Sequence, residues 1–156
     1  MGFRIKAFLM HLLASCVAAA FGLLLVFHIW HPNPLQKAVG VTNIFLMLLA
    51  IDVVVGPLLT LVVASSKEKK TLKFDLSVIA ALQLAAYLYG MHSIAVSRPV
   101  YLAFDALRFE VVQADSVVRA TDKTILPEYQ SNPLLYPQWV SVRPYQDAAE
   151  QSQRTF

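Results

Sequence analysis

A single aspartate stands in an otherwise apolar stretch, LLAIDVVVGPLLTL, at residues 48–61. Asp52 is followed one helical turn later by Gly56 and Pro57. A carboxylate at the centre of a membrane-crossing helix costs about 3 kcal/mol even on insertion-based scales, and such residues usually serve a function or meet a polar partner. Asp52 is therefore the first residue of this chain at which a functional site is predicted.

Two polar side chains of a later apolar stretch could reach Asp52. Asp52 is the midpoint of its own stretch, and the midpoint of the later one falls near Ala85. Gln83 and Tyr87 lie four residues apart, on one face of a helix, and they straddle that depth. If this face meets Asp52, we expect both side chains to form hydrogen bonds with its carboxyl group.

Pro57 adds a break in the main-chain hydrogen bonding next to Asp52. Because proline has no amide hydrogen, the carbonyl of Val53 loses its helical partner, which predicts a kink that Gly56 eases. Two interpretations stay open. This polar notch could be a buried cluster that fixes the register of packed helices, or it could receive another membrane helix. Its members are Asp52, Gly56, Pro57, Gln83 and Tyr87.

Histidines offer the other possible chemistry. His28 and His92 come near corresponding ends of two apolar stretches, so they could ligate a haem between two helices. A small membrane redox subunit is thus the alternative function. The single cysteine, Cys16, excludes a CxxC motif, and the sequence holds no HExxH, phosphate-binding glycine loop or nucleophile motif. We therefore predict no catalytic residue, no metal site and no cofactor.

The elements that carry these residues are predicted to be membrane helices. Of the 156 residues 57% are hydrophobic and only 15% charged, against about a quarter in soluble domains. Three apolar runs, at about residues 7–30, 41–64 and 75–96, reach the roughly 20 residues that cross a bilayer. Lipid demands internal backbone hydrogen bonds, which selects helices. The predicted fold is an all-α bundle of three transmembrane helices over residues 1–96, followed by a tail at 97–156.

Small residues and a possible cap refine the helices. Ala14, Ala18 and Gly22 recur at four-residue spacing and predict a smooth face on which another helix packs closely. Asp75 is expected to cap the start of the third helix. The string LASC, ending at Cys16, leaves open lipidation there or cleavage near Ala20. A retained first span is favoured because apolar residues continue up to residue 30.

The tail contains the strand signals of the chain. Residues 99–113 alternate β-branched and aromatic residues around a break at 105–107, which predicts a β-hairpin. Val100, Leu102 and Phe104 would share one face, with Phe109 and Val111 on the partner strand, and a further strand is possible at residues 139–142. A lone hairpin is marginally stable, so it should lean on neighbouring structure.

The distribution of basic residues predicts the orientation in the membrane. Arg4 and Lys6 precede the first run, and four lysines crowd residues 67–73, whereas the link between the first two runs has only Lys37. By the positive-inside rule, the N-terminus is cytoplasmic and the tail at 97–156 is periplasmic. Topology thus accounts for the net charge of +3, and neither nucleic acid nor a small-molecule substrate is expected as a partner.

Four blocks of sequence carry a resemblance to a known family. IKAFLMHLLAS, PLQKAVGVTNIFLMLLAIDVVVGPLLTLVV, KKTLKFDLSVIAALQLAAYLYG and RPVYLAFDALRFEVV occur in this order between residues 4 and 113. Together they resemble the TfpX/TfpZ family of type IV pilin accessory proteins. The resemblance implies a bacterial inner-membrane, multi-pass, chaperone-like protein without catalytic activity. Its expected partners are a cognate type IV major pilin and the lipid bilayer, and its expected role is in pilus assembly or surface display.

Overall fold

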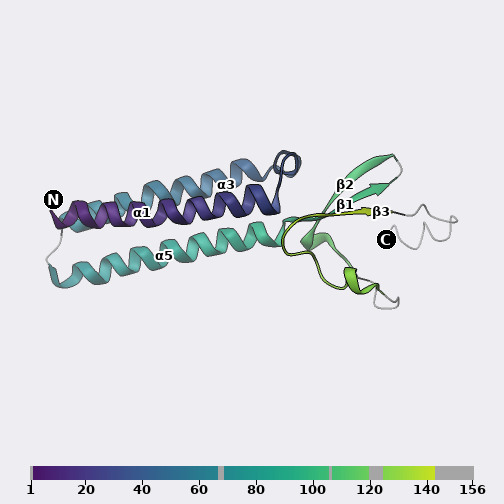
Figure 1. Ribbon diagram of the computed structural model, residues 1–156. Helices are drawn as coiled ribbons and strands as arrows, with labels where there is room; N and C mark the ends of the chain where they lie inside the picture. The colour runs from purple at the N-terminus through teal and green to yellow at the C-terminus, as the bar shows by residue number, and fades with distance from the viewer. Residues whose placement is uncertain (1, 67–68, 106, 120–124, 143–156) are drawn as a thin grey trace. The chain divides into compact units, whose positions relative to one another are not determined.

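The computed structural model describes residues 2–66, 69–105, 107–119 and 125–142. The chain divides into two compact units: a membrane-spanning unit, residues 1–96, and a sheet unit, residues 97–156 (Figure 1). The first unit contains three helices that are long and apolar enough to cross a membrane, and the second contains a small three-stranded sheet. The predicted fold class is confirmed.

The first span is one continuous helix with a wider final part. It consists of α1 (Phe3–Leu23) and the π-helical η1 (Leu24–Trp30), and it ends where the sequence HPNP begins. The link to the second span includes the short α2 (Leu35–Ala38). Gly40 closes the link with a φ of 68°, a left-handed conformation in which any other residue would be strained.

The second span contains the irregularity predicted at Pro57. It runs through α3 (Val41–Ala50), the π-helical η2 (Ile51–Val55) and α4 (Gly56–Ser66). The π-helical turn lies directly before Pro57, whose ring would clash with the carbonyl four residues earlier in a regular helix. A wider turn relieves that clash, so the expected break takes the form of a π-helical turn, a type often found at functional sites.

The third span starts earlier than predicted. α5 (Lys69–Val96) begins six residues before Asp75, so the prediction that Asp75 caps this helix is wrong. The intervening residues include no glycine or proline, and lysine and leucine are good helix formers, so nothing ends the helix there. The stretches apolar enough to span a membrane are Phe3–Trp30, Val41–Ala64 and Thr71–Val96.

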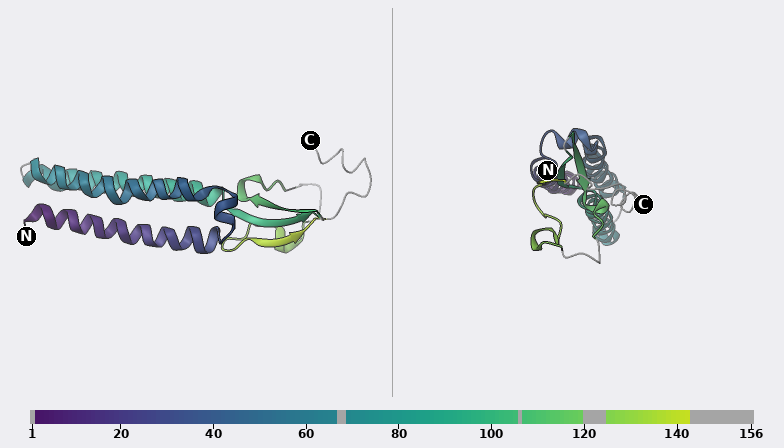
Figure 2. Two further views of the ribbon diagram at one scale, coloured as in Figure 1. Left: turned by 90° about the horizontal axis from the view of Figure 1, so that it is seen from above. Right: turned by 90° about the vertical axis from the view of Figure 1, so that its right-hand side faces the viewer.

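The second span holds the bundle together because it contacts both α1 and α5 (Figures 1 and 2). The core gathers where α1 and α5 end and α3 begins, and Phe45 is its fully buried centre. Phe45 meets the ring of Phe27 edge-on, with centroids 5.4 Å apart. The other buried core residues are Ala19, Val26, Val41, Leu49, Met91 and Ile94.

A buried histidine fixes the end of the first span. The side chain of His31 is 1% exposed, and both its main-chain N–H and its Nδ1 lie within hydrogen-bond distance of the Val26 carbonyl oxygen, at 2.8 and 3.3 Å. Burial lowers the pKa of His31 below its usual value. The imidazole is therefore neutral at neutral pH, which suits its place against the core.

The sheet unit confirms the predicted hairpin. β1 (Pro99–Asp105) pairs antiparallel with β2 (Arg108–Gln113), with Leu102 opposite Val111 and Phe104 opposite Phe109. The further strand is β3 (Gln138–Ser141), which pairs parallel with β1. The order β2-β1-β3 therefore makes β1 the central strand.

The described residues between β2 and β3 contact the sheet at Tyr101, whose ring lies 6.1 Å from that of Tyr129 and whose hydroxyl donates to the Ser131 carbonyl oxygen at 3.4 Å. They include the short 3₁₀ helices η3 (Ala114–Ser116) and η4 (Pro127–Tyr129). Asn132 fastens this segment, because its amide donates to the Ala114 carbonyl at 3.1 Å and its Oδ1 accepts from Arg119 at 2.6 Å. A separate group of large aromatic side chains stays exposed on the sheet: Phe104, Phe109 and Trp139.

Candidate functional site

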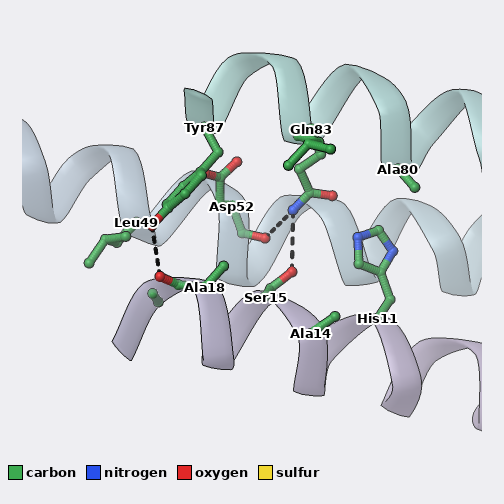
Figure 3. Close-up of a pocket in the computed structure, with 11 residues that line it drawn as sticks. His11, Ala14, Ser15, Ala18, Leu49, Asp52, Ala80, Gln83 and Tyr87 are labelled. Carbon is green, nitrogen blue, oxygen red and sulfur yellow. Dashed lines mark hydrogen bonds between the residues drawn. The ribbon is translucent and has the colours of Figure 1, made fainter. Parts of the chain in front are cut away.

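A cavity of about 190 Å³ lies at mid-span in the membrane-spanning unit (Figure 3). Its walls come from α1 and α5, and Leu49 and Asp52 of the second span also line it. Small residues border it on both walls, Ala14 and Ala18 from α1 and Ala80 from α5. The polar side chains around it are His11, Ser15, Asp52, Gln83 and Tyr87. Three members of the predicted polar notch thus line one cavity.

Gln83 connects all three spans at this point. Its amide nitrogen donates to the main-chain oxygen of Asp52 and lies 3.5 Å from Ser15 Oγ (Figure 3). Gly56 is required for this approach, because a Cβ atom there would overlap the Gln83 amide. Gly56 and Pro57 are both buried, and Pro57 is almost fully so. Gly56 therefore makes room for the amide that joins the spans.

Tyr87 binds the first span. Its hydroxyl donates to the main-chain oxygen of Ala18 at 2.8 Å (Figure 3). Gly22 permits the contact, since a Cβ there would come within 2.8 Å of the Tyr87 hydroxyl and 3.1 Å of the Phe45 ring. The expectation that Gln83 and Tyr87 both bond to the Asp52 carboxyl is therefore wrong. The close approach of α1 offers them other acceptors, and the sequence did not reveal that approach.

The Asp52 carboxyl group is buried without a donor. The residue is 7% exposed, and its Oδ2 has no hydrogen-bond partner in the part of the chain that the structure describes. The Oε1 atom of Gln83 is also buried without a hydrogen-bond partner among the described residues. The sequence has no lysine or arginine at 38–66 or 74–97, so neither of these two spans supplies a cation at this depth. Two buried oxygens at the cavity thus have no donor among the described residues.

A second polar contact joins α1 to α4. His11 Nδ1 and Thr60 Oγ1 form a hydrogen bond of 2.6 Å, and Thr60 is 3% exposed. His11, Ser15 and Thr60 were not predicted as site residues, because the polar groups predicted to meet at mid-span were Asp52, Gln83 and Tyr87. The signal was present, since His11 and Ser15 are four residues apart on one face of an otherwise apolar helix.

The close-packed stripe of α1 is displaced by one residue from the predicted face. Gly22 is buried as expected, but the buried residues beside it are Ser15 and Ala19. Ala14 is exposed and Ala18 is half-buried, and both line the cavity. Small residues occur on both neighbouring faces of this helix, so their spacing did not decide which of them are buried.

The geometry gives the haem alternative no support. The side chains of His28 and His92 are both exposed on the membrane-spanning unit. The interior histidine is His31, which uses Nδ1 in a contact with the main chain. Among the described residues, no group of three or more histidine, cysteine, aspartate or glutamate side chains could hold a metal ion.

Three apolar spans with a polar cavity at mid-depth, followed by a small sheet, define the class of this chain as a small multi-span membrane protein. Residues 1–40 match the family model described as fimbrial assembly protein FimB. The chain is 38% identical over 96 residues to the fimbrial assembly protein of serogroups C1 and C2 from Dichelobacter nodosus, and covers 73% of it. The chain therefore belongs to this family of fimbrial assembly proteins.

Two longer relatives extend the similarity along the chain. The fimbrial assembly proteins of serogroups I and E1, also from Dichelobacter nodosus, are 33% and 31% identical over 144 residues, or 92% of this chain. The chain spans only 56% of the length of each. No solved structure matches it.

Proposed function

We propose that this protein is a non-catalytic accessory protein of type IV pilus assembly, and that it binds the cognate major pilin in the membrane. The observation that carries the proposal is the mid-span cavity between α1 and α5, which has small residues on both walls and polar groups at its centre. Membership of a fimbrial assembly family supports the process. The resemblance to TfpX/TfpZ proteins supports the finer role, that of a chaperone-like protein for one pilin type.

The cavity has the features of a surface for helix packing. Helices approach closely in membranes where the side chains are small, as at Ala14, Ala18 and Ala80. A second apolar depression continues along α1 and shares Ala14, Ala18 and Tyr87 with the cavity. We call the two together the α1 groove. It forms a continuous surface beside α1 against which one face of an incoming apolar helix can pack.

The sheet unit offers a second surface for a subunit with a globular part outside the membrane. Phe109 lies 4.9 Å from Phe104 and 5.5 Å from Trp139, measured between ring centroids, and all three are exposed. β2 and β3 are the edge strands of the sheet, and edge strands can pair with an added strand. Chaperone-like action would then combine a seat for the subunit's apolar helix with contacts to its folded part.

The proposed location is the bacterial inner membrane, with the N-terminus in the cytoplasm and the sheet unit in the periplasm. The lysines around residues 67–73 and the basic N-terminus support this orientation. Alkaline phosphatase fused after Val112 should be active, since it is active only in the periplasm, and a fusion after Lys70 should be inactive. The reverse pattern would place the sheet unit in the cytoplasm and would contradict the proposed orientation.

Crosslinking in cells tests whether the groove holds pilin. A photoreactive amino acid at Ala14 or Ala80 should give a crosslink to the major pilin, because these positions face the cavity. Ile51 is the matched control, since it lies in the second span near the depth of Asp52 but is 52% exposed and does not line the cavity. We expect the yield from the groove positions to exceed the yield from Ile51 several-fold. Equal yields at comparable protein levels would contradict pilin binding at this site.

A further inference from the structure

We infer that the helix seated in the α1 groove carries a hydrogen-bond donor at the depth of Asp52. The inference rests on the proposed function, because it concerns the same groove, and it specifies the chemistry of the occupant. It starts from two buried oxygens at the cavity, Asp52 Oδ2 and Gln83 Oε1, neither of which has a donor in the described part of the chain.

No donor of the described residues lies within hydrogen-bond distance of these two oxygens, and this includes the Ser15 hydroxyl and the hydrogen left over in the His11–Thr60 pair. The amide nitrogen of Gln83 donates to the main-chain oxygen of Asp52, and the hydroxyl hydrogen of Tyr87 goes to Ala18. His11 and Thr60 are bonded to each other. With the Asp52 carboxyl ionised, these two oxygens therefore lack a donor, and an additional acceptor brought to the same place would be repelled.

The alternatives to a donor-bearing helix of another protein fit less well. Lipid chains at this depth carry no donor. A second copy of this protein would bring no lysine or arginine, because its spans have none between residues 7 and 36, 38 and 66, or 74 and 97. Its outward surface at this depth is mostly apolar, as at Ile51 and Leu82, which are 52% and 68% exposed, and the exposed hydroxyl of Tyr89 makes self-association one outcome of the test.

Pairing with such a donor would make binding selective. An unpaired buried acceptor is unfavourable, and a donor supplied by the partner relieves it only when the partner is bound. Measured intramembrane hydrogen bonds correspond to about a 3-fold change in affinity on average and up to about 30-fold in model helices. A helix with a suitable amide, hydroxyl or amine at this depth would therefore be preferred over a purely apolar helix of equal shape.

Designed peptides test this inference in the absence of pilin. The full chain is reconstituted in lipid nanodiscs with a fluorophore on Cys16, its only cysteine, which is exposed and does not line the cavity. Labelled leucine–alanine peptides of about 24 residues, long enough to span the bilayer, carry either glutamine or methionine at the centre. Glutamine and methionine have similar length and volume, and only glutamine donates. Energy transfer at increasing peptide concentration gives the two affinities.

We expect the glutamine peptide to bind the wild-type protein about 3- to 30-fold more tightly than the methionine peptide. Asp52→Leu should abolish this preference, whereas Asp52→Asn, which keeps an acceptor oxygen, should retain most of it. Equal binding of the two peptides to the wild-type protein would overturn the inference, and this comparison needs no variant that could misfold. A preference unchanged in Asp52→Leu, or self-association of labelled protein that excludes both peptides, would overturn it too. Pilin crosslinking stays a separate result, so either proposal can fail alone.

Discussion

Replacing Ala103 by proline is expected to unfold the sheet unit and to leave the membrane-spanning unit intact. Ala103 is buried in the central strand and is paired with Glu110 of β2 and with Val140 of β3. Because β1 has a neighbour on each side, the amide of Ala103 must face one of them, and proline would remove that hydrogen bond. The buried carbonyl left unpaired costs about 1–3 kcal/mol. A three-stranded sheet has little stability in reserve.

Limited proteolysis of the purified protein measures this effect. In the wild type, the strands β1, β2 and β3 should resist cleavage, and in Ala103→Pro they should be cut at protease concentrations roughly tenfold lower or less. Ala103→Ser is the matched control, since it keeps the main-chain N–H at the same buried position and should resist like the wild type. Membrane insertion of all three proteins should be equal. Wild-type resistance of the proline variant would show that β1 is not the central strand.

Replacing Phe45 by alanine should strongly destabilise the membrane-spanning unit. Phe45 has no exposed surface, meets Phe27 edge-on and packs against Gly22. Truncation of a buried phenylalanine in a soluble protein costs about 3–5 kcal/mol. Lipid chains are as apolar as this core, so the transfer part of that loss is small in a membrane. The lost packing and the cavity remain, and we expect a decrease of about 2 kcal/mol in the free energy of unfolding.

Denaturation in mixed micelles with increasing sodium dodecyl sulfate reports that free energy. Phe74→Ala is the control, because Phe74 lies on α5 but is 70% exposed. Its effect should stay within about 0.5 kcal/mol, as for other surface substitutions. If both variants lose the same stability, the difference between the buried and the lipid-facing ring disappears, and the core would not centre on Phe45.

The polar groups at mid-span divide into a part that holds the bundle and a part left unpaired. Gln83 and Tyr87 tie the third span to the main chain of the other two, at Asp52 and Ala18. Such bonds are what the register-fixing interpretation of the polar notch requires, and that role stays a prediction. The Asp52 carboxyl takes no part in these bonds, which leaves it for the role in the other interpretation. The two interpretations therefore concern different atoms of one cluster.

The sequence by itself determined the number and type of the elements. Three apolar runs of sufficient length predict three spans, because lipid permits few alternatives to a helix. Alternation around residues 105–107 predicted the hairpin and the side chains that share a face of each strand, because a strand repeats every two residues, and the structure pairs Leu102 with Val111 and Phe104 with Phe109. Pro57 predicted a break in the second helix, since the missing amide is a local property.

Only the tertiary structure decided which groups meet. Every span is apolar on all sides, so periodicity did not show that Ser15 and Ala19 are buried while Ala14 is exposed and Ala18 half-buried. The bonds of Gln83 and Tyr87 depend on how closely α1 approaches, which Gly22 and Gly56 allow without encoding a partner. The parallel place of β3 beside β1 depends on a long connection rather than on a local turn. Contacts between distant segments are set by packing, and this packing left the Asp52 carboxyl buried without a donor.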